Sequence, residues 1–328
     1  MRHLLKIRGN NFKLKMDTSK KIVIAGGAGL VGQNLVARLR DKDYPNIVVI
    51  DKNLPNLTTL KSLHPAINIH CADLSVVGDW CDHFSNAEVV VTLQAQISSL
   101  VDAEFVRNNI ESTRRIIDAI KLHHVPHLVH ISSSVLESVA NDFYTNTKRE
   151  QEELVLACGV PHIVLRPTLM FGWFDRKHLG WLSRFMKKVP VFPIPGHGRY
   201  MRQPLYVGDL CDIIISCIKT WKPEGVYNIS GHEQIDYIDI IREIKRVTRA
   251  RAAIVKIPYC LFYTLLWIWA RFDRNPPFTT QQLAALVGKD EFEVIDWPSI
   301  FGVPYTPFAK AIDETFNHPV YSKVVLEF

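Results

Sequence analysis

The sequence predicts an α/β protein with a doubly wound parallel sheet and a smaller, mostly helical C-terminal domain. Two observations carry this prediction. Short apolar runs with the composition of buried strands alternate with helix-like segments over the first two thirds of the chain. The first run, residues 22–25, leads into a glycine-rich turn and a helix, and a second run ends in an acid roughly 20 residues later.

The glycine-rich turn lies in the sequence KIVIAGGAGLVGQ. Gly26, Gly29 and Gly32 follow G-x-x-G-x-x-G spacing between the strand and a helix predicted over residues 34–40. A strand that turns sharply into a helix needs glycine, and the backbone must come close to donate N–H groups to a pyrophosphate. Asp51, at the end of the second run, is placed to bind a ribose 2′-hydroxyl. The pattern therefore predicts a dinucleotide site.

The remaining elements follow the same alternation of strands and helices. Further strands are predicted at residues 47–50, 67–70, 88–93, 127–131, 162–165 and 226–229, with helices at 102–121 and 142–157. We expect a basic, disordered extension at 1–20, a nucleotide-binding domain at 21–172 plus 204–231, and a substrate-binding domain at 173–203 plus 232–328.

Composition excludes two other classes of function. Residues 1–20 hold six Lys or Arg against the single acid Asp17, so most of the net charge of +6 lies in this extension. The nearly neutral remainder predicts no binding of nucleic acid. The six cysteines form no C-x-x-C pair and no metal-ligand pattern. We therefore expect reduced cysteines, no metal site and a cytoplasmic protein.

One apolar run, IPYCLFYTLLWIWA at residues 257–270, has three interpretations. It is shorter than the ~18 residues of a membrane-spanning helix. We expect a buried or half-buried helix of the smaller domain. The first alternative is peripheral contact with a membrane, which Trp267 and Trp269 between flanking basic residues would suit. The second alternative is an access channel for an apolar substrate.

Tyr144, Lys148 and Ser134 form the candidate catalytic group. Tyr144 and Lys148 lie four residues apart in YTNTK and share one helix face. The ordinary tyrosine pKa of about 10 is too high for easy proton exchange at neutral pH, and we expect the neighbouring ammonium to lower it. Ser134, after the preceding strand, can hold the substrate oxygen from which Tyr144 takes a proton. This group predicts hydride transfer beside a nicotinamide.

With these motifs in order, the chain resembles the extended short-chain dehydrogenases/reductases, in the NAD-dependent epimerase/dehydratase group that acts on nucleotide sugars. The resemblance covers roughly residues 21–320. It rests on GGAGLVG, Asp51, Ala72-Asp73-Leu74, Asn109, SSS at 132–134, Tyr144 with Lys148, Arg166-Pro167, and Arg202 followed by Val207 and Asp209. It implies a Rossmann fold and a homodimer.

The resemblance also implies which residues bind the cofactor and which bind the substrate. NAD would be bound by Gly26, Gly29, Leu30, Val31, Gly32, Asp51, Asp73, Leu74, Gln94, Asn109, Tyr144, Lys148 and Pro167. Asp51 favours NAD over NADP, because its carboxylate repels a 2′-phosphate. The substrate would be a nucleotide sugar, with Ser134 at the sugar and Arg202 at the diphosphate.

The chain departs from the family pattern directly after Ser134. Sugar 4,6-dehydratases carry an Asp-Glu pair there as acid and base, whereas this chain has Val135 and Leu136. The departure argues against dehydration and favours a 4-epimerase that acts by transient hydride transfer. The alternatives are an NAD(P)H-dependent reductase of nucleotide-linked keto sugars, an enzyme like the 3β-hydroxysteroid dehydrogenases, and a non-catalytic NAD(P)H-binding protein resembling an accessory subunit of respiratory complex I.

Overall fold

The computed structural model describes residues 19–137, 142–221, 225–272, 279–287 and 293–327. The predicted disordered extension at 1–20 therefore lies almost entirely outside the described residues. Within the described ranges, no helix has both the length and the apolar character needed to cross a bilayer.

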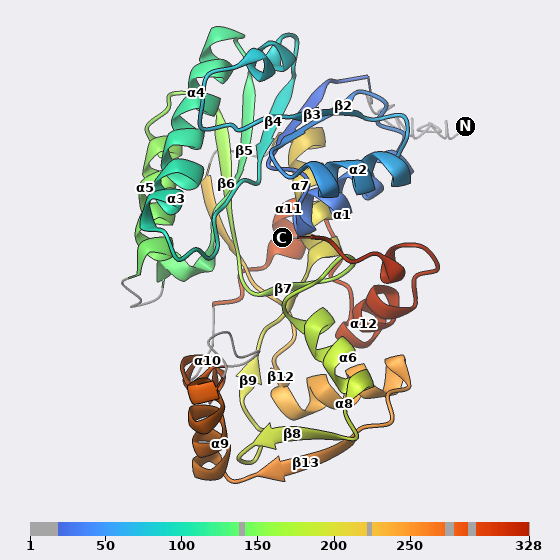
Figure 1. Ribbon diagram of the computed structural model, residues 1–328. Helices are drawn as coiled ribbons and strands as arrows, with labels where there is room; N and C mark the ends of the chain where they lie inside the picture. Colours follow the sequence, from blue (N-terminus) through green and yellow to red (C-terminus); the bar gives the residue numbers. More distant parts are fainter. Residues whose placement is uncertain (1–18, 138–141, 222–224, 273–278, 288–292, 328) are drawn as a thin grey trace, which may run out of the picture.

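A seven-stranded parallel sheet forms the larger half of the molecule (Figure 1). Its strands, in spatial order, are β11 (Gly225–Ile229), β6 (His162–Pro167), β5 (His127–Ile131), β4 (Val89–Thr92), β1 (Ile22–Ala25), β2 (Ile47–Asp51) and β3 (Asn68–Cys71). Each strand predicted for this sheet is present within two residues of its expected bounds, which confirms the doubly wound parallel fold. The strand order reverses at β1, between β4 and β2, so ligands are expected at the carboxyl ends of these strands.

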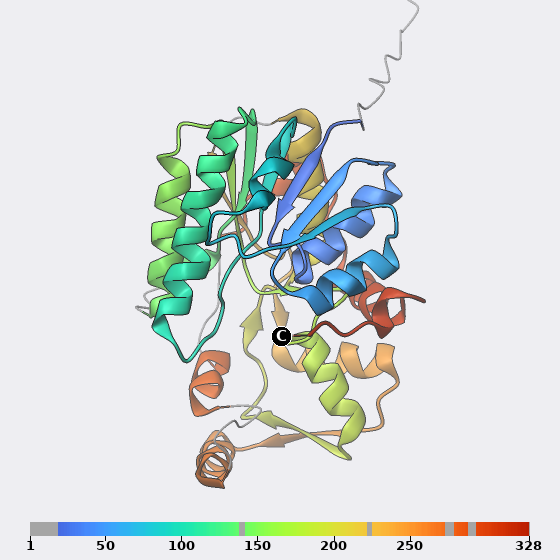
Figure 2. The same ribbon diagram turned by 45° about the horizontal axis from the view of Figure 1, so that its top comes forward.

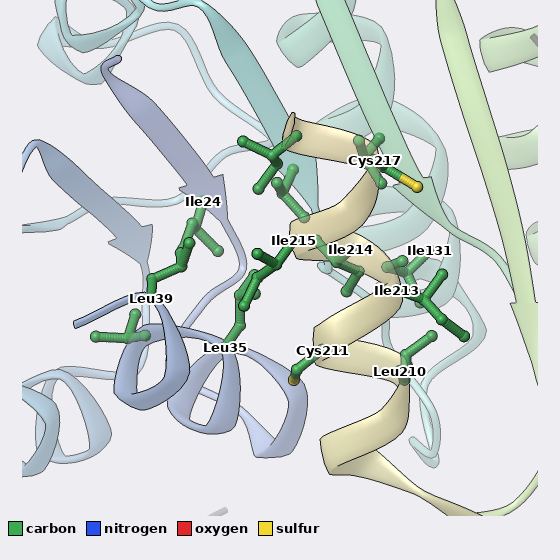
Figure 3. Packing of buried hydrophobic residues seen from close by; sticks show 14 of the residues in the cluster. Ile24, Leu35, Leu39, Ile131, Leu210, Cys211, Ile213, Ile214, Ile215 and Cys217 are labelled. Carbon is green, nitrogen blue, oxygen red and sulfur yellow. The ribbon is translucent and has the colours of Figure 1, made fainter. Parts of the chain in front are cut away.

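Helices cover both faces of the sheet because successive strand residues point to opposite sides. Ile22 and Ile24 of β1 belong to one core cluster, whereas Val23 and Ala25 belong to another. The first cluster packs against α1 (Leu30–Asp41), α2 (Leu54–Leu63), α7 (Val207–Thr220) and α11 (Trp297–Phe301). The second packs against η1 (Asp79–Phe84), α4 (Ser112–Leu122) and α5 (Phe143–Leu156). Figure 3 shows the apolar side chains of α7 reaching α1 and the sheet.

The helix predicted over residues 102–121 is divided into three parts. It comprises α3 (Asp102–Phe105), a turn of π-helix η2 (Val106–Glu111) and α4. The helix predicted at 34–40 begins earlier, since α1 starts directly after Gly29. Single π-helical turns occur frequently at functional sites, and this one carries Asn109.

The smaller domain has its own apolar core between helices and short strands. Its elements are β7 (Met170–Phe171), α6 (Leu179–Lys188), β8 (Val191–Pro195), β9 (Met201–Arg202), β10 (Leu205–Tyr206), β12 (Ile235–Asp236), α8 (Tyr237–Thr248), β13 (Ala253–Ile257), α9 (Tyr259–Phe272), α10 (Thr280–Val287) and α12 (Phe308–Asn317). Side chains of α6, α8, α12 and β8 share this core. The expected smaller, mostly helical C-terminal domain is confirmed.

C-terminal segments also contact the nucleotide-binding half. The indole N–H of Trp297 in α11 donates to the carbonyl of Ser230 at 3.1 Å. Near the end of the chain, the backbone N–H of Glu327 donates to Asn56 Oδ1 at 2.8 Å. These contacts join C-terminal segments to the nucleotide-binding half, and Figure 2 shows the C-terminus between the two parts of the molecule.

Helix α9, which holds most of the apolar run 257–270, is not buried. None of its side chains is buried, and only Tyr259, Phe262 and Leu266 are partly covered. The expectation of a buried or half-buried helix is therefore wrong for most of its surface. An apolar run has the same composition whether or not the rest of the chain covers it.

Candidate active site

The three glycines of the turn after β1 differ in whether packing requires them. Gly26 has a φ of +76°, and a Cβ added to it would lie 2.4 Å from the backbone nitrogen of Gln94. A Cβ on Gly32 would lie 2.1 Å from the carbonyl oxygen of Gly27, so α1 packs closely on the turn. A Cβ on Gly29 would meet no atom within 4 Å. Packing therefore requires Gly26 and Gly32, whereas Gly29 faces open space.

That open space lies at the N-terminus of α1. Gly29 is the N-cap residue, and no side chain caps the helix. The first N–H groups of an uncapped helix are an anion-binding site. The predicted ligands Leu30 and Val31 form the first turn of α1, so their backbone groups lie at this N-terminus. The turn thus fits the phosphates of a dinucleotide.

Asp51 closes the other side of the turn. Its carboxylate accepts the N–H of Ala28 at 3.0 Å and the N–H of Asn53 at 2.9 Å. Burial raises the pKa of this carboxyl, and the backbone hydrogen bonds oppose that rise. The acid predicted at the ribose thus lies beside the predicted phosphate site, held by the same turn.

Lys148 lies in a buried polar cluster on α5. Its side chain is about 1% exposed, and Nζ donates to the carbonyl of Ile131 at 3.1 Å and to Gln151 Oε1 at 2.6 Å. Burial lowers the pKa of Lys148 to about 7. Gln151 and Gln94 both donate to Thr113 Oγ1, at 2.9 and 3.1 Å. The cluster therefore links Lys148 to Gln94, whose backbone contacts Gly26.

Asn109 joins the loop after β4 to α5. Its side chain is fully buried, Oδ1 accepts the N–H of Gln96 at 2.7 Å, and Nδ2 donates to Thr147 Oγ1 at 3.0 Å. Buried amides with both ends bonded fix the backbone around them. Asn109 thus positions the helix that carries Tyr144 and Lys148.

Tyr144 is hydrogen-bonded to the side chain of Ser133, one residue before the predicted Ser134. Ser134 is buried at the start of η3 (Ser134–Glu137). Burial raises the pKa of Tyr144, while the Ser133 hydrogen bond opposes that rise. The expectation that Lys148 lowers the pKa of Tyr144 is wrong here, because the Lys148 ammonium is directed to Ile131 and Gln151.

The other predicted cofactor residues lie at the same edge of the sheet or in its core. Asp73 follows β3 and forms an ion pair with Arg107. Burial favours the neutral form of Asp73, but hydrogen bonds from Ser75 and Arg107 outweigh it and lower the pKa. Leu74 is buried in the core, and Pro167 ends β6.

Arg202, the predicted diphosphate ligand, lies in the smaller domain on β9. It is 8% exposed, and its guanidinium donates to the carbonyls of Met201, at 3.0 Å, and of Leu286 in α10. Asp209, which also matched the family pattern, accepts both the backbone N–H of Thr306 at 3.0 Å and its hydroxyl at 2.6 Å. Burial raises the pKa of Asp209 to about 6. Asp209 thus anchors a C-terminal loop to α7.

Sequence reasoning missed several residues of the site. Ser133 was overlooked although it lies in the same serine run as Ser134, and Gln151 although it follows Lys148 by three residues on the same helix. Arg107 carried no signal, since its contact with Asp73 joins segments far apart in the sequence.

The family model "NAD dependent epimerase/dehydratase family" matches residues 22–230. The dTDP-glucose 4,6-dehydratase of Escherichia coli is 22% identical over 275 residues, which span 69% of this chain and 76% of that protein. The human dTDP-D-glucose 4,6-dehydratase is 22% identical, over 69% of this chain and 73% of that protein.

Solved structures resemble the whole fold. The UDP-glucose 4-epimerase of Thermotoga maritima, solved with UDP-glucose, has a TM-score of 0.69 at 17% identity, covering 91% of this chain and 98% of its own. The UDP-glucuronic acid 4-epimerase of Bacillus cereus, solved with NAD, has a TM-score of 0.67 at 19% identity, covering 91% and 96%. These likenesses show the fold. Because the family model matches most of the chain, and its glycine turn and acid fit a dinucleotide, the chain belongs to the NAD-dependent epimerase/dehydratase family.

Proposed function

We propose that this protein is a nucleotide-sugar 4-epimerase that uses NAD. The observation that carries the proposal is the hydrogen bond between Tyr144, on the same helix as Lys148, and Ser133, which follows β5. The residues that follow the serine run are Val135 and Leu136. The site thus has groups for moving a hydroxyl proton, and apolar residues in place of the dehydratase acid and base.

Different residues of the chain would carry out different steps of this reaction. Bound NAD would supply the hydride acceptor, held by the glycine turn and Asp51. Tyr144 would exchange a proton with the sugar 4-hydroxyl, and Ser133 or Ser134 would hold the oxygen. Tyr144 would take the proton of the 4-hydroxyl as a phenolate and return it to the keto oxygen as a phenol, so the proton is balanced over one turnover. Burial raises the pKa of Tyr144 and therefore favours the phenol, which is the form that returns the proton. Lys148, with a pKa of about 7, is poised between its charged and neutral forms.

Dehydration is the second candidate, because the curated relatives are named 4,6-dehydratases. Loss of water from the sugar needs an acid for the departing hydroxyl and a base for a carbon-bound proton. Val135 and Leu136 supply neither. We therefore place epimerisation first.

Arg202 is the proposed ligand of the substrate diphosphate. Its guanidinium donates to the backbone carbonyls of Met201 and Leu286. A diphosphate offers charged oxygens that match the planar guanidinium, so substrate binding would redirect this side chain. Such an exchange would couple substrate binding to the position of α10.

The first experiment uses the purified full-length protein. After denaturation, any released dinucleotide is identified, and the native protein is assayed without added cofactor on UDP- and dTDP-sugars. We expect stoichiometric NAD and redox-neutral interconversion of two 4-epimeric sugars. Formation of a 4-keto-6-deoxy sugar would favour dehydration, and turnover of keto sugars only with added NADH or NADPH would favour a reductase.

A further inference from the structure

Helix α9 exposes an apolar surface that the described part of the chain leaves uncovered. Its sequence is YCLFYTLLWIWARF, and it has no charged residue before Arg271. Leu265 is 51% exposed, Trp267 and Trp269 are each 48% exposed, and Phe272 is 88% exposed. Helices that are apolar on all sides are normally buried in a protein or a membrane.

The helix lies at the outer end of the smaller domain, away from the seven-stranded sheet. Figures 1 and 2 both place α9 at the extremity of the molecule, beside the β8–β13 pair. The partly covered residues Tyr259, Phe262 and Leu266 share one face. Leu261, Leu265, Ile268 and Phe272 follow i, i+4, i+7, i+11 spacing and form an exposed stripe elsewhere on the helix.

The segments that build this end of the domain are basic. Residues 187–199 contain three Lys or Arg and residues 245–272 contain six, and neither segment contains Asp or Glu. Lys256 and Arg271 are exposed at the two ends of α9. The guanidinium of Arg271 lies 4.3 Å from the centre of the Trp267 ring. Lys256 and Arg271 thus place one exposed cation near each end of the apolar helix.

We propose that α9 seats the protein on membranes containing anionic lipids, lying in the plane of the interface. Tryptophan, tyrosine and long basic side chains are the residues that favour the boundary between lipid and water. At 14 residues, α9 is too short to span a bilayer. A second copy docked symmetrically on the same surface would bring like charges together, which disfavours self-association. This inference does not depend on the proposed reaction.

The test is flotation of the full-length protein with two kinds of vesicle. One kind is phosphatidylcholine alone, and the other is phosphatidylcholine with phosphatidylglycerol. We expect the protein to float with the anionic vesicles and to be released by salt, which screens the cations. Trp267 and Trp269 should then show a blue-shifted emission, whereas Trp80 and Trp297 are already buried and should not respond.

Paired variants identify the surface responsible. Leu265→Ser combined with Ile268→Ser should weaken partitioning by about tenfold or more, since both side chains enter the apolar layer. Lys256→Glu should weaken binding to the anionic vesicles but should not change binding to vesicles of phosphatidylcholine alone. The matched control is Leu122→Ser, at the end of α4 in the other half, where the leucine is 70% exposed. The control should bind vesicles like the wild type.

Three results would overturn the proposal. The first is no flotation with either vesicle. The second is an equal loss of binding in Leu122→Ser, which would indicate nonspecific adhesion. The third is concentration-dependent dimerisation that the Leu265→Ser, Ile268→Ser variant abolishes without any vesicle binding, which would assign α9 to a second copy of the chain.

Discussion

The carboxyl edge of the sheet and the outer end of the smaller domain distribute polar and apolar residues in opposite ways. At the sheet edge, Lys148, Gln151 and Asn109 are buried, and each is hydrogen-bonded within the chain. At the outer end, the apolar side chains of α9 are exposed, with Lys256 and Arg271 beside them.

The difference indicates how each region is completed. A buried polar cluster is costly unless its members bond to one another, so the geometry of the sheet edge is fixed before any ligand binds. An exposed apolar helix gains free energy only when something from outside covers it. The first region is therefore tested by changing its internal contacts, and the second by supplying a surface.

The largest expected effect comes from Tyr144→Phe. Removing the hydroxyl would remove the proposed proton exchange with the sugar, and we expect kcat to fall about 1000-fold. Affinity for NAD should change little, because the glycine turn and Asp51 are intact. Sugar interconversion measures kcat, and a dinucleotide titration measures affinity. Tyr263→Phe, on exposed α9, is the matched control. Full activity in Tyr144→Phe would refute the proposed proton donor.

The next largest effect is expected on stability, from a substitution in the glycine turn. Gly26 is required by the fold, whereas Gly29 is not. Gly26→Ala forces a side chain into positive φ and into the Gln94 backbone, so the free energy of unfolding should fall by about 3 kcal/mol. Gly29→Ala should change stability by less than about 0.5 kcal/mol, since its Cβ meets open space. Urea unfolding measures both.

Gly29→Ala should nevertheless weaken dinucleotide binding by about tenfold, because the methyl group enters the space in front of α1. A titration with NAD measures this loss. Wild-type affinity in Gly29→Ala would contradict the placement of the phosphates at that helix end. Gly26→Ala and Gly29→Ala thus distinguish a residue needed for folding from a residue needed for dinucleotide binding.

The sheet and the glycine turn could be predicted from the sequence because their signals are local. β-Branched runs such as Ile47–Ile50 mark buried parallel strands, and the glycine spacing marks the turn after β1. The four-residue spacing of Tyr144 and Lys148 likewise follows from helix geometry alone. These features need no knowledge of distant contacts.

The remaining features depend on tertiary contacts. Which serine of the run bonds Tyr144 depends on where β5 ends and η3 begins, which composition does not specify. The same holds for Arg202, whose partner carbonyl lies in α10. The exposure of α9 was mispredicted because hydrophobicity indicates a preference for burial and does not show whether the chain satisfies it.

The pH dependence of stability tests the buried cluster at Lys148. Burial lowers the pKa of Lys148 from 10.5 to about 7, so between these values the unfolded chain binds a proton that the folded chain lacks. Stability therefore rises with pH in this window, by about 2 kcal/mol between pH 7 and 9. Lys148→Met removes this contribution. Urea unfolding of the wild type and of Lys148→Met at each pH measures this contribution. If the free energy of unfolding of the two proteins depended on pH in the same way, the pKa of Lys148 would not be lowered by burial.

The smallest expected effect concerns the choice of dinucleotide at Asp51. Asp51→Asn keeps the shape of the side chain but removes the charge that we propose repels a 2′-phosphate and binds a ribose hydroxyl. We expect the preference for NAD over NADP to fall by about tenfold, which is the scale of one charge-assisted hydrogen bond. Titration with each dinucleotide measures the ratio of the two affinities.

Asp43→Asn is the control, since Asp43 is exposed and its φ of 59° suits asparagine. An unchanged ratio in Asp51→Asn would mean that the acid serves the turn, through its hydrogen bond from Ala28, and does not select the cofactor.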